Sequence, residues 1–177
     1  MATDVRVLFS EREVRDRVAK LAAQITADYA PVLKPDENLL MVGVLRGAFV
    51  FLADLARGIH LPVEIDFVRA ESYRNGKSSA NLTMAAALPT QVCNRHVLLV
   101  EDMADTGKTL QLVVSSIAQG LPASLKVACL IDRALPRERQ PRPDYVGFHV
   151  QGRQFLVGYG LDHAGRYREL PYIGALE

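Results

Sequence analysis

Residues 97–110 read Val97-Leu98-Leu99-Val100-Glu101-Asp102-Met103-Ala104-Asp105-Thr106-Gly107-Lys108-Thr109-Leu110, and this stretch decides the fold. Its apolar beginning predicts a strand that is buried on both faces, as the strands of parallel sheets are. An acidic pair, a third carboxylate and a Thr-Gly-Lys-Thr turn follow, and an apolar-periodic helix begins after them. The end of a buried strand that leads into a helix is where open α/β sheets bind ligands. A helix N-terminus at such a turn presents free N–H groups and a positive dipole end, which together favour a phosphate.

Strand and helix signals alternate along the rest of the chain. Short apolar or alternating runs predict strands at residues 39–45, 63–67, 127–131, 145–150 and 155–159, with a weaker candidate at 82–86. Helices are expected after the capping box of Ser10 and Glu13, from Phe49 to Ala56, and from Leu110 until Gly120. The repeated order of strand, helix and strand implies an α/β fold with a twisted, mostly parallel sheet flanked by helices.

The composition fits one ordered domain and excludes some classes of function. The chain has 177 residues, 49% of them hydrophobic, and a formal net charge of +1. Such a balanced charge argues against a dedicated nucleic-acid or membrane-surface binder. Charges spread over the first fifteen residues leave no hydrophobic signal segment, and no apolar run approaches the ~20 residues of a membrane span. We therefore expect a cytoplasmic protein in which Cys93 and Cys129 are buried, reduced thiols.

Two nucleotide-binding motifs are suggested by the sequence, and neither is complete. The phosphate loop G-x-x-x-x-G-K-[S/T] needs a glycine five residues before Gly107, but Asp102 occupies that position. Gly158 and Gly160 begin a dinucleotide-type pattern, but His163 stands in the place of its third glycine.

The three acids of the stretch indicate a binding site of another kind. Adjacent Glu101 and Asp102 are costly to desolvate unless they pair or bind something, such as the vicinal hydroxyls of a ribose or a divalent cation. Asp105 lies inside the turn, where it can meet a ligand. The alternative is that these acids cap the helix and line a hydrated loop. Three acids beside a phosphate-type turn favour the binding site.

With its flanking residues, the stretch resembles the phosphoribosyl-pyrophosphate (PRPP) motif of type I phosphoribosyltransferases, in the form seen in bacterial hypoxanthine(-guanine) phosphoribosyltransferases. Other segments resemble that family in the same order: a pyrophosphate-binding turn at Val44–Phe49, the Ser72-Tyr73 pair of a flexible lid, a purine-binding segment at Phe155–Asp162 and a C-terminal signature at Arg166–Gly174. The resemblance implies a single domain over residues 1–177. Its core would span about 38–150, and a small hood would be formed by about 151–177 with N-terminal contributions.

The resemblance implies a purine-salvage enzyme. Its reaction would transfer the phosphoribosyl group of PRPP to a 6-oxopurine, hypoxanthine and also guanine, giving IMP or GMP and pyrophosphate. Mg²⁺ would be the cofactor, and a homodimer or homotetramer would be the assembly. Neither a membrane nor a nucleic acid is expected as a partner.

The resemblance also implies roles for residues of the stretch. Glu101 and Asp102 would hold the ribose hydroxyls, and Asp105 would be the general base toward N7 of the purine. The residues implied to hold the 5′-phosphate are Asp105, Thr106, Gly107, Lys108 and Thr109. Lys108 is equally well explained as a solvated surface lysine.

Residues outside the stretch would complete the implied site. Pyrophosphate would be bound by Arg46, Gly47 and Arg168, and the peptide bond between Leu45 and Arg46 would be cis. The purine would be bound by Arg133, Phe155, Leu156 and Asp162. The implied Mg²⁺ ligands are Asp162, Glu101 and Asp102, and Ser72 and Tyr73 would belong to a lid over residues 71–81. Without its neighbours, Phe155 would be explained as core packing.

Two positions depart from the family pattern. Arg133 stands where the family usually has a lysine that donates to the 6-oxo group of the purine, and Arg74 replaces a glycine of the lid. Because a guanidinium fork is not interchangeable with an ammonium, the same chemistry on another oxopurine such as xanthine stays open. A non-catalytic PRPP- or nucleotide-binding regulator on this fold is the other alternative. Its RNA contact would be the arginines of residues 133–142, but Glu138 interrupts them and no aromatic residues interleave for stacking.

Overall fold

A six-stranded sheet forms the body of the protein. The computed structural model describes residues 4–73, 81–84, 91–133 and 141–177. The strands of the sheet lie in the order β4-β3-β2-β5-β6-β7. Their bounds are β2 (Leu39–Leu45), β3 (Val63–Tyr73), β4 (Asn81–Met84), β5 (His96–Ala104), β6 (Ser124–Arg133) and β7 (Tyr145–Val150). The neighbours from β3 to β7 are parallel, and β4 pairs with the end of β3 in the antiparallel direction. The predicted mostly parallel sheet is confirmed.

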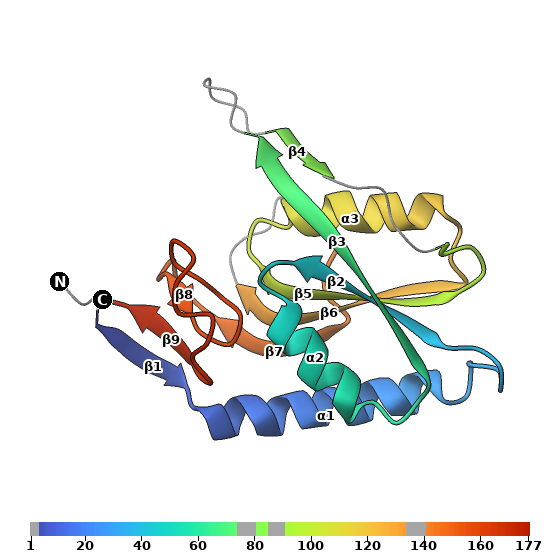
Figure 1. Ribbon diagram of the computed structural model, residues 1–177, viewed down its shortest axis with the longest axis horizontal. Coiled ribbons are helices and arrows are strands. Elements are labelled where there is room, and N and C mark those ends of the chain that lie inside the picture. Colours follow the sequence, from blue (N-terminus) through green and yellow to red (C-terminus); the bar gives the residue numbers. More distant parts are fainter. Residues whose placement is uncertain (1–3, 74–80, 85–90, 134–140) are drawn as a thin grey trace.

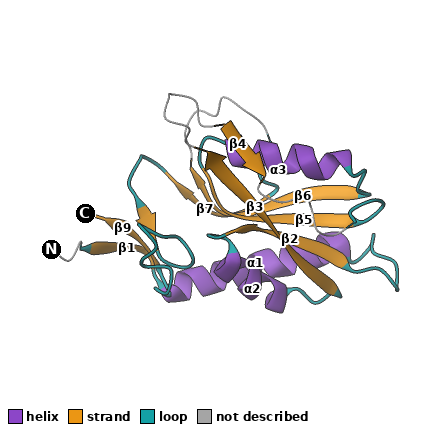
Figure 2. Ribbon diagram, turned by 45° about the horizontal axis from the view of Figure 1, so that its top comes forward, coloured by secondary structure: helices purple, strands orange, loops and turns teal. Residues whose placement is uncertain are grey.

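Within the described ranges, three helices cover the two faces of this sheet. Helices α1 (Glu11–Tyr29) and α2 (Phe49–Gly58) pack on one face, and α3 (Lys108–Gln119) packs on the other (Figures 1 and 2). Alternate residues of β2 enter the two cores: Leu39 and Met41 lie in the core under α1 and α2, and Leu40 and Val42 lie in the core under α3. A strand buried on both faces needs the continuous apolar run that the sequence has here.

The start of α1 is fixed by the predicted capping box. The Ser10 hydroxyl accepts a hydrogen bond from the Glu13 amide at 3.4 Å, and the Ser10 amide donates to the Glu13 carboxylate at 2.8 Å. Further along the helix, Arg17 donates to the carbonyl oxygen of Gly147 on β7 at 2.7 Å. This contact ties α1 to the outer parallel strand.

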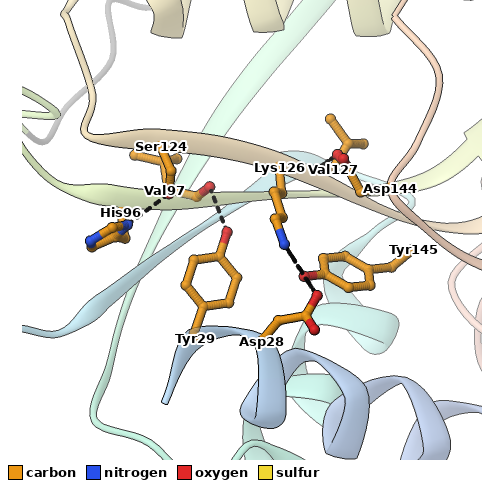
Figure 3. A network of polar contacts seen from close by, with 9 residues as sticks. All are labelled: Asp28, Tyr29, His96, Val97, Ser124, Lys126, Val127, Asp144 and Tyr145. Carbon is orange, nitrogen blue, oxygen red and sulfur yellow. Dashed lines mark hydrogen bonds and ion pairs between the residues drawn. The ribbon is translucent and has the colours of Figure 1, made fainter. Parts of the chain in front are cut away.

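The end of α1 is held by a polar network at the amino end of the sheet (Figure 3). Asp28 accepts hydrogen bonds from the Tyr145 hydroxyl at 2.7 Å and from the Lys126 ammonium at 3.1 Å. The ammonium also donates to the Tyr145 hydroxyl at 3.0 Å, so the three groups form a closed set. Beside them, burial raises the pKa of Tyr29 to about 12.

A second, smaller sheet is built from both ends of the chain. Strands β1 (Val5–Phe9), β9 (Ile173–Leu176) and β8 (Leu156–Val157) form an antiparallel sheet in that order. It lies beside the large sheet and above the start of α1 (Figure 1). The sequence did not predict β1 or β9 as strands, although a hood with N-terminal contributions was expected. We call this sheet and the loops between β8 and β9 the hood.

Two local predictions are wrong. The predicted strand at 155–159 is confined to Leu156–Val157, because Gly158, Tyr159 and Gly160 have positive φ angles of 93, 50 and 96° and turn the chain. Cys93 is exposed, since it lies in a turn next to Asn94, whose φ is 57°, whereas Cys129 is buried as predicted. The weak strand candidate at 82–86 corresponds to β4, and residues 85 and 86 lie outside the described residues. Within the described part of the chain, no helix is long and apolar enough to cross a membrane.

Candidate functional site

The acidic pair lies at the carboxyl end of β5, inside the strand itself. Glu101 is only 4% exposed, and its Oε1 accepts a hydrogen bond from the Asp102 amide at 3.3 Å. Its Oε2 is buried and has no hydrogen-bond partner among the residues that the structure describes. Burial and the neighbouring Asp102 charge raise the pKa of Glu101 well above its usual range. A buried carboxyl oxygen without a partner is unfavourable in the free protein, so a ligand that supplies a donor or a cation would be bound strongly here.

The turn after β5 places a helix N-terminus beside these acids. Gly107 has a φ of 78°, which glycine adopts without strain, and α3 begins at Lys108. Gly107 has no side chain to cap the helix, and the Lys108 amide donates only a long hydrogen bond, at 3.5 Å, to the Thr106 hydroxyl, so this N–H group is weakly engaged in the free protein. Asp105 and Thr109 are partly buried at the turn, and Thr106 and Lys108 are exposed. The predicted phosphate-type turn therefore has the required local structure.

A second turn, between β2 and α2, packs directly against the acidic pair. The peptide bond between Leu45 and Arg46 is cis, as the resemblance implied. A Cβ atom at Gly47 would overlap the carboxylate of Asp102. A Cβ atom at Gly160, in the hood, would overlap the carbonyl oxygen of Gly47. The β5 end, the 45–48 turn and the hood therefore pack closely at these two glycines, and a side chain at Gly47 would displace the Asp102 carboxylate.

The hood brings the remaining predicted residues to this junction. Arg168 forms an ion pair with Asp162 at 2.7 Å and donates to the carbonyl oxygen of Gly160 at 2.5 Å. Asp162 also accepts a hydrogen bond from the Gly165 amide at 2.7 Å. The two residues that the sequence assigned to Mg²⁺ and to pyrophosphate are thus paired with each other in the free protein.

Phe155 is an exposed aromatic residue at the edge of the hood. It is 51% exposed, and the ring of His163 meets it edge-on with a centroid distance of 4.9 Å. The next residue, Leu156, is buried in β8. An exposed ring held by one edge contact suits the stacking of a planar ligand, whereas the alternative of core packing does not fit its exposure. The sequence did not predict the contact between His163 and the Phe155 ring, although His163 directly follows the predicted purine-binding segment.

Arg133 is buried at the end of β6 and has protein acceptors. Its guanidinium donates to the carbonyl oxygens of Gly152 at 3.0 Å and Gln154 at 2.6 Å. Its Nε lies 3.3 Å from the sulfur of Met103 on β5. The predicted purine-binding residue therefore lies between the β5 end and the segment that carries Phe155.

Other predicted elements are described only in part. Ser72 and Tyr73 form the last residues of β3, and their backbones pair with Leu82 and Asn81 of β4. The lid residues 74–80, including Arg74, and the loop residues 134–140 lie outside the described residues. A further link, which the sequence did not predict, joins the hood to α2, because the Tyr159 hydroxyl donates to Asp54 at 2.5 Å.

The site offers oxygen ligands to a cation but no complete set. In the described ranges, no three acidic, histidine or cysteine side chains converge on one point. Glu101 nevertheless has a buried, unpartnered oxygen, and Asp102 is next to it. Mg²⁺ prefers a few carboxylates together with water and phosphate oxygens. The acidic pair therefore fits a Mg²⁺ ion whose other ligands come from a bound phosphate compound.

Comparisons with known proteins agree with this geometry. A sequence profile of the phosphoribosyl transferase domain matches residues 7–164. The chain is 43% identical to the hypoxanthine phosphoribosyltransferase of Haemophilus influenzae, over 96% of this chain and 94% of that protein. It is 39% identical to the hypoxanthine-guanine-xanthine phosphoribosyltransferase of Tritrichomonas foetus, over 97% and 91%. The structure of the Trypanosoma cruzi hypoxanthine phosphoribosyltransferase with the product IMP is similar with a TM-score of 0.89 and 34% identity, over 99% of this chain and 95% of that one.

Proposed function

This chain belongs to the phosphoribosyl transferase family, and on that premise we propose that it is a hypoxanthine-guanine phosphoribosyltransferase of purine salvage. It transfers the phosphoribosyl group of PRPP to hypoxanthine or guanine and releases pyrophosphate. Whole-length similarity to relatives of this activity supports the proposal. The observation that carries it is the buried Glu101 carboxyl, whose Oε2 has no hydrogen-bond partner among the described residues, beside a helix N-terminus that Gly107 leaves without an N-cap side chain. A ribose 5-phosphate group has hydroxyls that can donate to the Glu101 carboxyl and a phosphate that can bind at the N-terminus of α3.

The sugar and its 5′-phosphate are held at the carboxyl end of β5. Glu101 and Asp102 accept hydrogen bonds from the ribose hydroxyls. The N–H groups at the start of α3, from Asp105 to Thr109, bind the 5′-phosphate with the hydroxyls of Thr106 and Thr109, because helix N-termini attract anions. Lys108 is exposed and supplies positive charge nearby.

The leaving pyrophosphate is held on the opposite side of the ribose. The N–H groups of Arg46 and Gly47 face it, and Gly47 is close enough to Asp102 for the ribose and pyrophosphate subsites to share one boundary. Arg168 moves its guanidinium from Asp162 to the pyrophosphate. Glu101, Asp102 and Asp162 are the residues that would hold Mg²⁺, and the bound ion would supply positive charge to the pyrophosphate.

The purine is held between the hood and the turn after β5. Phe155 stacks on the ring, and the backbone of Leu156 pairs with the edge of the base. Asp105, partly buried at the turn, accepts the proton from N7 as the bond to the anomeric carbon forms. The lid segment with Ser72 and Tyr73 closes over the reacting carbon and excludes water.

Xanthine is the second candidate base. Arg133 replaces the lysine that the family usually has, and the Tritrichomonas foetus relative that carries xanthine in its name is 39% identical. The same fold and the same transfer chemistry would serve this substrate.

A base panel tests the proposed function. Purified protein is incubated with PRPP, Mg²⁺ and one of hypoxanthine, guanine, xanthine or adenine, and nucleotide and pyrophosphate are measured. We expect turnover of hypoxanthine and guanine and none of adenine. Turnover of xanthine at a comparable kcat/KM would establish the second candidate, and no turnover of any base would contradict the proposal.

We also propose that the protein is a homodimer or homotetramer. Ile65 and Phe67 of β3 and Phe49 of α2 are 46%, 40% and 43% exposed, which is high for large apolar residues. A cavity of about 720 Å³ opens beside Phe49 between α1, α2 and the hood. Sedimentation equilibrium at micromolar concentration should give a multiple of the 19.5 kDa chain mass. A monomer would contradict this proposal and leave the enzymatic one intact.

A further inference from the structure

The guanidinium of Arg133 is surrounded by groups of the protein. The residue is 6% exposed, and burial of an arginine requires partners for its N–H groups. Two partners are the carbonyl oxygens of Gly152 and Gln154, at 3.0 and 2.6 Å. The third is the sulfur of Met103, a weak acceptor, at 3.3 Å from Nε. Each of the three guanidinium nitrogens thus points at a protein atom.

These partners belong to two different parts of the proposed site. Gln154 immediately precedes Phe155, the proposed stacking residue, and Gly152 lies two residues before Gln154. Met103 immediately follows Asp102. The carbonyl oxygen of Phe155 is also held by β9, because the Leu176 amide donates to it at 3.0 Å. Earlier in the segment, Gly152 has a φ of 85° with open space where a Cβ atom would lie, and Arg153 is exposed. The antiparallel pairing of Leu156 with Ala175 follows directly in the two-residue β8. Arg133 therefore joins the β5 end to the segment that carries Phe155.

We infer that Arg133 is a positioning residue that fixes the 152–155 segment, and through it the Phe155 ring, instead of donating to the 6-oxo group of the purine. The inference rests on the proposed function in one respect, the assignment of Phe155 as the residue that stacks on the purine. The contacts of Arg133 are independent of that assignment. Arg133 then controls how well any purine ring stacks, whatever substituent the ring carries at position 6.

The shape of the side chain explains why an arginine does this. A guanidinium has parallel N–H groups that reach two carbonyl oxygens at once and a separate Nε that faces Met103. A lysine at this position has one nitrogen on a flexible stem, so it can hold one carbonyl and loses the contact with Met103. Arg133→Lys therefore retains the charge and releases part of the segment.

Hydrogen exchange of the free protein tests the contacts without using activity. The measurement compares the backbone amides of residues 152–157 in the wild type, Arg133→Met, Arg133→Lys and the matched control Arg153→Met. We expect faster exchange in Arg133→Met by roughly tenfold, as expected for the loss of charge-assisted hydrogen bonds, an intermediate rate in Arg133→Lys and no change in Arg153→Met. Wild-type exchange in Arg133→Met overturns the inference. If Arg133→Met does not fold, wild-type exchange in Arg133→Lys overturns it.

Kinetics then separate positioning from direct recognition of the base. The KM for hypoxanthine is compared with the inhibition constant of unsubstituted purine, which lacks the 6-oxo group. Positioning predicts that Arg133→Met raises both constants by the same factor, about tenfold, with a smaller change in kcat. It also predicts that the factor disappears in the Phe155→Ala background, because the ring to be positioned is absent.

The opposite kinetic result has a distinct signature. An increase confined to hypoxanthine, and unchanged in the Phe155→Ala background, overturns the inference and assigns Arg133 to the 6-oxo group. If the wild type turns over no base at all, the proposed function fails, while the exchange measurement still decides whether Arg133 fixes the segment.

Discussion

Acidic residues at the two ends of the parallel sheet have opposite surroundings. At the amino end, Asp28 has two donors, the Tyr145 hydroxyl and the Lys126 ammonium, and all three groups contact one another (Figure 3). At the carboxyl end, Glu101 is more deeply buried, yet one of its oxygens has no partner within the described residues. These surroundings shift the pKa in opposite directions: hydrogen bonds lower that of Asp28, and burial raises that of Glu101.

This difference distinguishes a residue that stabilises the fold, Asp28, from a residue that we propose binds a ligand, Glu101. The Asp28 network joins α1 to β6 and β7, so its groups are satisfied as soon as the chain folds. Oε2 of Glu101 has no hydrogen-bond partner among the described residues of the free protein, so a bound group that donates to it or carries positive charge is favoured there. Strained or unsatisfied groups of this kind are common at functional sites, where stabilising contacts elsewhere in the fold offset their unfavourable free energy.

The largest expected effect is at the carboxyl end, on catalysis. Asp105→Asn should lower kcat by about 100-fold or more, because an amide cannot accept the proton of the purine nitrogen. PRPP binding should remain close to that of the wild type, since the phosphate is held by N–H groups of the turn. Steady-state kinetics with hypoxanthine, together with direct binding of PRPP, check both parts. Unchanged kcat would remove Asp105 from the role of base.

The second-largest effect is expected on the stability of the free protein. Glu101→Gln should raise the free energy of unfolding of the free protein by about 1 kcal/mol at neutral pH, because the raised pKa of the buried Glu101 carboxyl destabilises the folded state there and an amide does not titrate. Urea denaturation without ligands measures this change. A loss of stability would mean that Glu101 holds the fold in the way Asp28 does, and the contrast between the two ends would fail.

The smallest effect is expected at the amino end, with the opposite sign. Asp28→Asn should lower the free energy of unfolding by less than about 1 kcal/mol, because Asp28 is 40% exposed and solvent screens its charge. The lowered pKa of Asp28 means that its stabilising contribution is present above the usual aspartate range and is lost as pH falls through the lowered pKa. The difference between wild type and variant should therefore shrink below about pH 4, the ordinary aspartate range. Urea denaturation at a series of pH values checks the trend, and a difference that grows toward acid pH would contradict it.

The sequence predicted the large sheet well because its strands carry local signals. The apolar run at 39–45 and the alternating run at 145–150 coincide with β2 and β7. Strands β1 and β9 were missed because they are short and pair with each other across the whole chain, Val5 beside Leu176. Only that pairing, which no local pattern encodes, makes them strands.

The site was predicted in part, for a similar reason. The turn at 105–109 and the acidic pair are contiguous in the sequence, so their pattern could be recognised. The overlap of Gly47 with Asp102 and the bonds from Arg133 to residues 152 and 154 join distant segments. The sequence indicated that Arg133 was unusual, but only the folded chain shows which atoms its guanidinium reaches.

Titration calorimetry of PRPP with Mg²⁺ tests most directly the claim that the carboxyl end of β5 is built for this ligand. We expect the wild type and Asp28→Asn to bind PRPP with the same affinity. Glu101→Gln should bind about tenfold more weakly or worse, as expected for the loss of charged hydrogen bonds to a ligand. Equal affinity of Glu101→Gln and the wild type, or the absence of PRPP binding to the wild type, would contradict it.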